Sequence, residues 1–213
     1  AALSIIRDAE SKNLFEPEGL IVEGTAGNTG IGLTVIGQAL GYKTLIVMPE
    51  TQSEEKKSSL KDLGASLLLV PALPYSNPGN YIRVSEKVAK EKNAFWANQF
   101  DNISNKMAHI EGTSQEIWSQ TNQTIDAFIS AVGTGGTLSG VSQGLKHKNK
   151  NIVTVCADPY GSGMYTWIKE GEANASGSSI TEGIGQSRIT KNLKDAPIDD
   201  AFQINDSEAL NII

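Results

Sequence analysis

The chain has 213 residues, of which 39% are hydrophobic and 20% are charged, a composition typical of a globular protein with a sizeable buried core. Its net charge of -6 argues against a nucleic-acid partner, which requires a basic surface. The sequence shows no apolar run long enough to cross a bilayer and no signal peptide. Its two histidines and one cysteine lack the spacing of a protein-held metal site. We therefore expect no nucleic-acid, membrane or metal-binding function.

Short apolar runs alternate with longer amphipathic segments in the first half of the chain. The pattern predicts helices over residues 1–13, 29–40, 54–63 and 80–92, and strands over residues 20–22, 43–48, 66–70 and 95–96. Ser53 stands at the start of the third helix as its N-terminal cap. Gly41 and Gly64 stand where left-handed residues are expected to end helices.

The same alternation continues in the second half. It predicts helices over residues 105–120 and 137–145, strands over residues 126–132, 152–157 and 201–204, and a loop over residues 170–179. Asp206 is expected to cap a final helix. Cys156 lies in an apolar strand, so we expect a buried and chemically inert thiol, and a single cysteine excludes a disulfide framework. A reducing compartment fits this cysteine usage.

Strands that alternate with helices of this length are typical of βαβ units and parallel sheets. We therefore predict an α/β protein with two three-layer domains built on mainly parallel sheets. The pattern changes near residues 100–105. The expected division is a smaller domain over residues 14–102 and a larger one over residues 1–13 and 103–213.

The strongest local signal is the turn from Gly133 to Thr137, which reads Gly-Thr-Gly-Gly-Thr between an apolar strand and a helix. Backbone N–H groups at a helix start have no partner within the helix, and the helix dipole adds positive charge there. Glycines let the backbone approach an oxyanion closely. The pattern favours a phosphate cradle, although a tight turn that binds nothing has the same appearance. Leu138 stands where a dinucleotide fingerprint requires its third glycine.

A second glycine turn, Glu23 to Gly32, combines hydroxyl and amide side chains with glycines. Thr25 and Thr29 can donate hydrogen bonds to a carboxylate, beside the free N–H groups. Asn28 can cap the following helix or offer its amide to a ligand. A plain capping turn is the alternative. Because both turns follow strands of parallel sheets, where ligands bind, the two turns together suggest a ligand with a phosphate end and a carboxylate end.

The motifs Thr25 to Gly30, Gly133 to Thr137 and Glu182 to Gly185 resemble the cysteine synthase family of pyridoxal-phosphate enzymes, which have fold type II. Shorter segments stand in the family's order and at about its spacing: Val47-Met48-Pro49-Glu50-Thr51, Leu63-Gly64-Ala65, Asn98-Gln99-Phe100 and Glu116-Ile117-Trp118. The likeness therefore covers nearly the whole chain.

The resemblance implies a role for each matching residue. The cofactor-binding residues would be Asn28, which meets the ring hydroxyl oxygen, and the phosphate cradle Gly133, Thr134, Gly135, Gly136 and Thr137. The substrate-binding residues would be Thr25, Ala26, Thr29 and Gln99 at the α-carboxylate, with Gly183 and Gly185 lining the substrate side. For His109, which also matches a family position, we prefer a supporting or packing role.

The implied reaction is a β-replacement that makes L-cysteine from O-acetylserine, or a similar activated serine, and sulfide, with pyridoxal 5'-phosphate as cofactor and electron sink. Binding of the substrate carboxylate would close the smaller, mobile domain over the site. The resemblance also implies a homodimer. We expect a cytoplasmic location, or a mitochondrial one if a targeting segment precedes the chain.

The sequence departs from the family at three points. The lysine that holds the cofactor in the family precedes the first helix, and Lys12, Lys43 and Lys61 look like solvated ends of elements. No catalytic residue is therefore assigned, and we expect a fold that is incomplete at both ends and inactive as this segment alone. The family's contact to the pyridine nitrogen lies further downstream. Ala26 stands where many members have serine.

Three other interpretations remain open at the level of the sequence. A β-eliminating enzyme of the serine or threonine dehydratase type has the same fold, although the surroundings of Gln99 and the Glu182 to Gly185 segment favour the synthase. A non-catalytic relative would explain Ala26 and the missing lysine. A nucleotide-binding dehydrogenase fragment fits poorly, because the glycine spacing is wrong.

Overall fold

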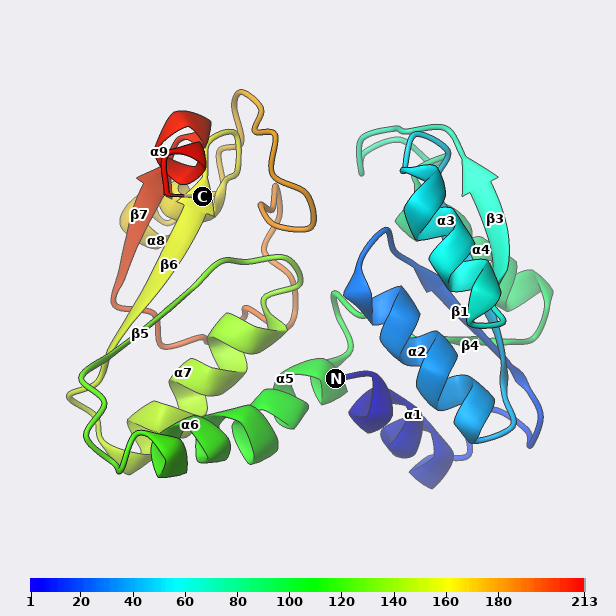
Figure 1. The fold of residues 1–213 in the computed structure, drawn as a ribbon, viewed down its shortest axis with the longest axis horizontal. Helices are drawn as coiled ribbons and strands as arrows, with labels where there is room; N and C mark the ends of the chain where they lie inside the picture. The colour runs from blue at the N-terminus through cyan, green and yellow to red at the C-terminus, as the bar shows by residue number, and fades with distance from the viewer. Residues whose placement is uncertain (213) are drawn as a thin grey trace. The chain divides into compact units, whose positions relative to one another are not determined.

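A computed structural model describes residues 1–212 and shows two compact units, residues 1–99 and a second unit that begins at Phe100. Both units alternate strands with helices, and each contains one parallel sheet (Figure 1). The α/β class and the parallel sheets predicted from the sequence are confirmed. No helix within residues 1–212 is both long and apolar enough to cross a membrane.

The first unit has a four-stranded sheet in the order β3-β2-β1-β4. Its elements are α1 (Ala2–Ser11), β1 (Leu20–Gly24), α2 (Asn28–Ala39), β2 (Lys43–Pro49), α3 (Glu54–Asp62), β3 (Ser66–Val70), α4 (Tyr81–Glu91) and β4 (Phe95–Trp96). Ser53 caps α3 as predicted, with its hydroxyl accepting from the Lys56 N–H at 3.4 Å. Gly41 and Gly64 both have left-handed backbone angles, as expected for residues that end helices.

Helices cover both faces of this sheet, because alternate strand residues point to opposite sides. Ile21 packs with Ile5 of α1 and Leu33 of α2. Its neighbour Val22 packs on the other face with Ala89 of α4. Burial of each such large side chain contributes roughly 1.5–3 kcal/mol. The first unit is therefore the three-layer arrangement that the sequence predicts.

Residues 1–13 group with the first unit in this structure, whereas sequence reasoning placed them in the larger domain. The physical reason is the apolar face of α1, where Ile5, Ile6 and Ala9 are fully buried against α2 and the sheet. The division of the whole protein into domains stays a prediction.

The second unit has a three-stranded sheet in the order β5-β6-β7. Its elements are α5 (Ile103–Ala108), the π-helical turn η1 (His109–Thr113), α6 (Ser114–Gln120), β5 (Ala127–Ser130), α7 (Gly136–Lys148), β6 (Val153–Pro159), α8 (Met164–Glu170), β7 (Asp200–Ile204) and α9 (Asp206–Leu210). The predicted helix over residues 105–120 is thus interrupted by η1. Asn205, one residue before Asp206, caps α9.

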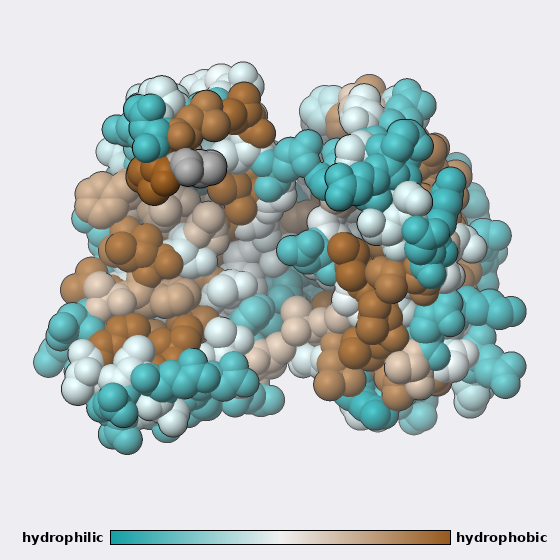
Figure 2. Space-filling view, in the orientation of Figure 1, coloured by the Kyte–Doolittle hydropathy of each residue, from teal (hydrophilic) through white to brown (hydrophobic). Residues whose placement is uncertain are grey.

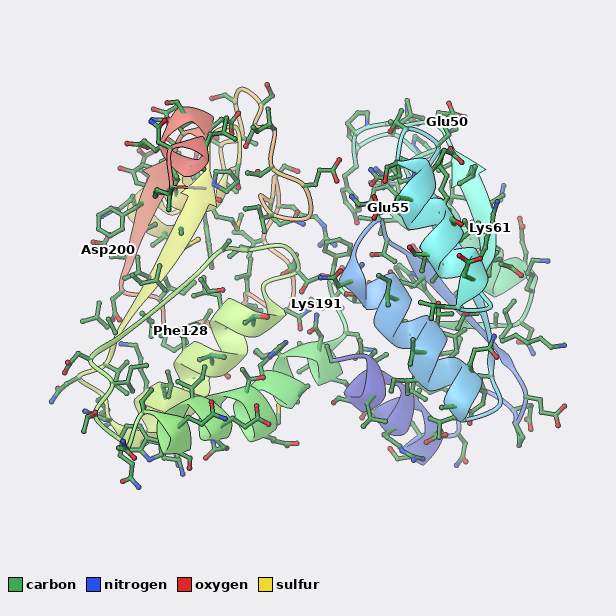
Figure 3. The ribbon with its side chains drawn as sticks, viewed as in Figure 1. Glu50, Glu55, Lys61, Phe128, Lys191 and Asp200 are labelled. Atoms are coloured by element: carbon green, nitrogen blue, oxygen red, sulfur yellow. The ribbon has the colours of Figure 1, made fainter. Side chains whose placement is uncertain are left out.

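One face of this sheet is packed and the other is open within the described residues. Phe128 of β5, labelled in Figure 3, packs on the covered face with Cys156 and Leu138. On the opposite face Ile129 and Phe202 are 61% and 56% exposed. Figure 2 shows apolar side chains over β5, β6 and β7. The layers of this unit, as described, are therefore the sheet and the helices on one side.

Cys156 lies at the centre of the covered face and is fully buried. Burial raises the pKa of its thiol to about 12, and the nearby carboxyl of Asp158 adds to this shift. The thiolate is the reactive form of cysteine, so the buried position is confirmed and the raised pKa favours the predicted lack of reactivity.

We expect iodoacetamide at pH 8 to leave Cys156 unmodified in the native protein and to alkylate it once guanidinium chloride unfolds the chain. Intact mass spectrometry over time measures both rates on the only thiol present. Rapid alkylation of the native protein would contradict the burial of this residue.

Candidate functional site

Each glycine turn follows the carboxyl end of a parallel strand and leads into a helix, the position at which ligands bind in α/β sheets. The first lies between β1 and α2, and the second between β5 and α7. Since the two units are described separately, the geometry of each turn is given by itself.

The second-unit turn presents unpaired backbone donors. Gly135 has φ +85 and stands before the first residue of α7, and no side chain caps the helix. Within residues 1–212, the N–H groups of Thr134, Gly135 and Thr137 have no hydrogen-bond acceptor. The first turn of α7 contains no acidic residue that could serve instead. Donors and dipole thus both favour an anion at this helix start.

Neighbouring residues fix the shape of this turn. The Thr134 hydroxyl accepts from the side-chain amide of Asn105 at 2.9 Å and from the Gly136 N–H at 3.3 Å. The Thr134 carbonyl accepts from the Thr190 hydroxyl at 2.7 Å. Asn105 is almost fully buried, so its hydrogen bond to Thr134 is shielded from water. Sequence reasoning missed both Asn105 and Thr190.

The three glycines of the turn are required by close packing around it. A Cβ on Gly133 would lie 2.5 Å from the carbonyl oxygen of Gly183. A Cβ on Gly135 would collide with Leu193, and one on Gly136 with Asn105. The predicted residues Gly183 and Gly185 are left-handed, and the Gly185 N–H donates to the Val132 carbonyl at 2.8 Å. The structure therefore brings the Gly183 to Gly185 segment against the Gly133 to Thr137 turn.

A row of glycines at every fourth position of α7 explains how Asn105 reaches the turn. Gly136, Gly140 and Gly144 share one face of the helix, and α5, η1 and α6 lie against that face. A Cβ on Gly140 would stand 2.5 Å from the Lys106 carbonyl oxygen, and one on Gly144 would collide with Ser114. Small residues let two helices approach closely, and this approach positions the residues of α5 and η1.

The close packing of η1 against α7 also positions His109. Its Nδ1 lies 3.0 Å from the Thr113 hydroxyl, and its Nε2 lies 3.3 Å from the Thr137 hydroxyl. Burial lowers the pKa of the imidazole, which favours its neutral form. His109 therefore contacts Thr137 at the end of the Gly133 to Thr137 turn, and its supporting role stays a prediction.

The first-unit turn also presents unpaired donors. Helix α2 begins after Gly27, which has no side chain to cap it. Within residues 1–212, the N–H groups of Ala26, Asn28 and Thr29 have no acceptor. The capping alternative for Asn28 is wrong, because Asn28 is the first helical residue and its exposed amide makes no hydrogen bond in the described part of the chain. The amide is thus available to a ligand.

The threonines of this turn differ in their surroundings. Thr25 is buried, and its hydroxyl accepts from the Gly27 N–H at 3.1 Å while keeping its own proton for another acceptor. The hydroxyl of Thr29 makes no hydrogen bond within residues 1–212. The Gln99 side chain donates to the Gly24 carbonyl at 3.4 Å, so the structure places Gln99 beside the start of the turn.

Glu23, at the end of β1, has no exposed surface and was not singled out from the sequence. Its carboxyl accepts from the N–H groups of Gly24, at 2.8 Å, and Gln99, at 3.0 Å. Burial raises the pKa of this carboxyl to about 8, although both N–H donors act to lower it.

The lysines that the sequence presents as solvated are exposed. Lys12 pairs with Asp8 at 2.7 Å on the surface of α1, and Lys43 begins β2. Lys61 stands on the outer surface of α3 (Figure 3).

Two parallel sheets, each with a glycine turn that exposes N–H donors at a helix start, define an α/β protein with two helix starts that favour anions. A sequence model of the family described as pyridoxal-phosphate dependent enzyme matches residues 1–213. The chain belongs to this family.

Individual relatives agree with the family assignment. Cysteine synthase 1 of Emericella nidulans is 47% identical over 219 residues, and the match covers 100% of this chain and 59% of the relative. O-acetyl serine sulfhydrylase isoform 3 from Entamoeba histolytica superimposes with a TM-score of 0.85 at 35% identity, covering 98% and 60% of the two chains. O-ureido-L-serine synthase superimposes with a TM-score of 0.87 at 31% identity, covering 99% and 64%. The chain thus spans less than two thirds of the length of these relatives.

The glycine row of α7 yields a stability prediction. Gly140→Ala is expected to lower the free energy of unfolding by roughly 1–3 kcal/mol, because the new methyl group forces α5 and η1 away from α7. Urea unfolding followed by circular dichroism measures the change.

Gly112→Ala is the matched control. Gly112 lies in η1, and nothing stands within 4 Å of the position that its Cβ would take. A gain of up to about 1 kcal/mol is expected there, since alanine reduces the conformational freedom of the unfolded chain. Equal effects of the two variants would show that close helix approach is not the reason for Gly140.

Proposed function

We propose that this chain carries the cofactor-phosphate and substrate-carboxylate sites of an enzyme that makes L-cysteine from O-acetylserine, or a similar activated serine, and sulfide. The observation that carries the proposal is the pair of helix starts after Gly27 and Gly135, where several backbone N–H groups have no acceptor within residues 1–212. The 47% identity to a cysteine synthase supports the choice of reaction.

The second-unit turn fits the phosphate of pyridoxal 5'-phosphate. Its glycines keep Cβ atoms out of the turn, and the N–H groups of Thr134, Gly135 and Thr137 supply directed donors to a dianion. Each hydrogen bond to a charged oxygen contributes roughly 1.5–3 kcal/mol. Such a turn needs no lysine or arginine to hold the group.

The proposed roles of the first unit concern the amino acid and the cofactor ring. The N–H groups of Ala26 and Thr29, with the hydroxyls of Thr25 and Thr29 and the amide of Gln99, would bind the substrate carboxylate. Asn28 would donate to the ring hydroxyl oxygen. When bound, pyridoxal phosphate supplies an electron-poor ring that stabilises negative charge at the α-carbon of the substrate. Gly183 and Gly185 would line the substrate side in the second unit.

We also propose a homodimer, on the strength of the family resemblance, and a cytoplasmic location as the default. Light scattering of the purified full gene product tests the first, and cell fractionation tests the second.

The reaction itself is tested with the full gene product, loaded with pyridoxal phosphate and given O-acetyl-L-serine and sulfide. We expect formation of cysteine that requires both substrates. Release of pyruvate without cysteine would instead support the β-eliminating alternative. Binding of the cofactor without turnover of either kind would support the non-catalytic relative and overturn the proposal.

Asn28→Ala is expected to weaken the affinity of the full gene product for pyridoxal phosphate by roughly tenfold to hundredfold, because one hydrogen bond to a charged oxygen is lost. Absorbance titration with the cofactor measures the affinity. Asn151→Ala is the control, since Asn151 is an exposed asparagine of the second unit whose side chain makes no hydrogen bond in the described part of the chain. An unchanged affinity in the Asn28 variant would remove this residue from the cofactor site.

Thr29→Val is expected to raise KM for O-acetyl-L-serine by about tenfold and to leave the affinity for pyridoxal phosphate unchanged, since the hydroxyl is proposed to meet only the substrate carboxylate. Valine keeps the shape of threonine, so steady-state kinetics report the loss of the hydroxyl. A rise in KM for sulfide alone would contradict this role.

A further inference from the structure

The buried carboxyl of Glu23 is the feature of the first unit that the proposed chemistry leaves unused. Glu23 has no exposed surface, and no basic side chain in residues 1–212 pairs with it. Transfer of a carboxyl group from water into such a position is unfavourable unless hydrogen bonds compensate. A side chain of this kind is therefore expected to have a specific task.

The hydrogen bonds of Glu23 connect two segments that are distant in sequence. One carboxyl oxygen accepts from the Gly24 N–H at 2.8 Å, directly before the Thr25 turn. The other accepts from the Gln99 N–H at 3.0 Å, 76 positions along the chain. The Gln99 side chain returns to the Gly24 carbonyl at 3.4 Å. The three residues thus form a closed set of contacts at the end of β1.

The backbone next to Gln99 needs such a restraint. Asn98 has φ +49, a left-handed conformation that asparagine adopts more readily than most residues other than glycine. Its buried side-chain oxygen has no hydrogen-bond partner within residues 1–212, and this feature disfavours the path of the chain after β4. The Gln99 N–H nevertheless donates to the Glu23 carboxyl, and this hydrogen bond stabilises the backbone conformation after β4.

The backbone at Gly24, the other segment that Glu23 contacts, is restrained by close packing. A Cβ at this position would lie 2.7 Å from the Ser85 hydroxyl and 2.8 Å from the Cα of Ile82. The start of the Thr25 turn therefore passes against α4 with little freedom to move. Sites that bind a carboxylate through several donors lose affinity when the donors are displaced by about 1 Å.

We propose that Glu23 is a positioning residue of the substrate-carboxylate site. Its carboxyl fixes the backbone at Gly24 and Gln99. Thr25, Thr29 and Gln99 can then bind the same substrate carboxylate. This inference rests on the proposed function of the first-unit turn. Glu23 touches neither substrate nor cofactor in this role and acts through the two backbone segments that it joins.

Glu23→Gln is the test, because glutamine keeps the size of the side chain but opposes one of the two N–H donors with its own NH₂ group. In the full gene product loaded with pyridoxal phosphate, we expect KM for O-acetyl-L-serine to rise by about tenfold, with kcat within threefold of wild type. KM for sulfide is expected to stay unchanged. Amide hydrogen exchange at Gly24 or Gln99 is expected to accelerate.

Ile6→Ala is the matched control for stability. Ile6 is fully buried in α1 of the same unit and does not touch the turn, so its truncation destabilises the fold through a cavity alone. We expect this variant to keep the wild-type KM for O-acetyl-L-serine and the wild-type exchange at Gly24 and Gln99 relative to neighbouring amides.

The outcomes separate this inference from the function on which it rests. An unchanged KM in Glu23→Gln, or an equal rise in KM in Ile6→Ala, would overturn the positioning role while leaving the synthase proposal intact. A wild-type protein that neither binds nor turns over O-acetyl-L-serine would overturn both. Faster exchange with a selective rise in KM supports the role of Glu23.

Discussion

Backbone N–H groups without partners at the start of a helix are the constraint on which both candidate sites depend. Several helices of this chain satisfy these groups with a side chain: Ser53 caps α3, Asn80 caps α4, Asn102 caps α5 and Asn205 caps α9. Helices α2 and α7 begin instead after Gly27 and Gly135, which have no side chain to offer. Helix α8, which follows β6, also lacks an N-cap hydrogen bond, but the side chains of Ser162 and Asp158 accept from its first two N–H groups. Helices α2 and α7, which follow β1 and β5 at the edge where α/β sheets bind ligands, keep several N–H groups without an acceptor among the described residues.

Open donors bind an anion well only when their directions are fixed, and each unit fixes them differently. In the second unit, the row of glycines on α7 lets Asn105 approach Thr134 and shape the turn from a buried position. In the first unit, a buried carboxylic acid joins the strand end at Gly24 to the segment at Gln99. Neither Asn105 nor Glu23 needs to contact a ligand. Both stabilise the conformation of the turn that would bind it.

The sequence predicts most of the strands, most of the helices and the two turns, because these depend on local periodicity and on glycine chemistry. The details that it misses depend on contacts between distant residues. Helix α8 has only seven residues, too few for a helical period to stand out between glycines. The turn η1 interrupts a helix whose apolar pattern runs on unbroken. The sequence alone indicates no task for Glu23, because its contact with the Gln99 N–H joins residues 76 positions apart. The spacing of Gly136, Gly140 and Gly144, by contrast, was a signal for close helix approach that could have been used.

The two turns also differ in how far they can discriminate between ligands. Donors from the backbone recognise charge and geometry, so the Gly133 to Thr137 turn suits a phosphate whatever the rest of the ligand. The Thr25 to Thr29 turn adds hydroxyl groups, whose presence or absence changes from one relative to another. At residue 26 this chain offers a methyl group and an unpaired N–H, where many members of the cysteine synthase family have a serine hydroxyl as well. A lost hydroxyl removes one donor near the substrate and leaves the phosphate turn untouched. Under the proposed roles, selectivity for the amino acid therefore resides in the first unit, and it can change without any change in how the cofactor phosphate is held.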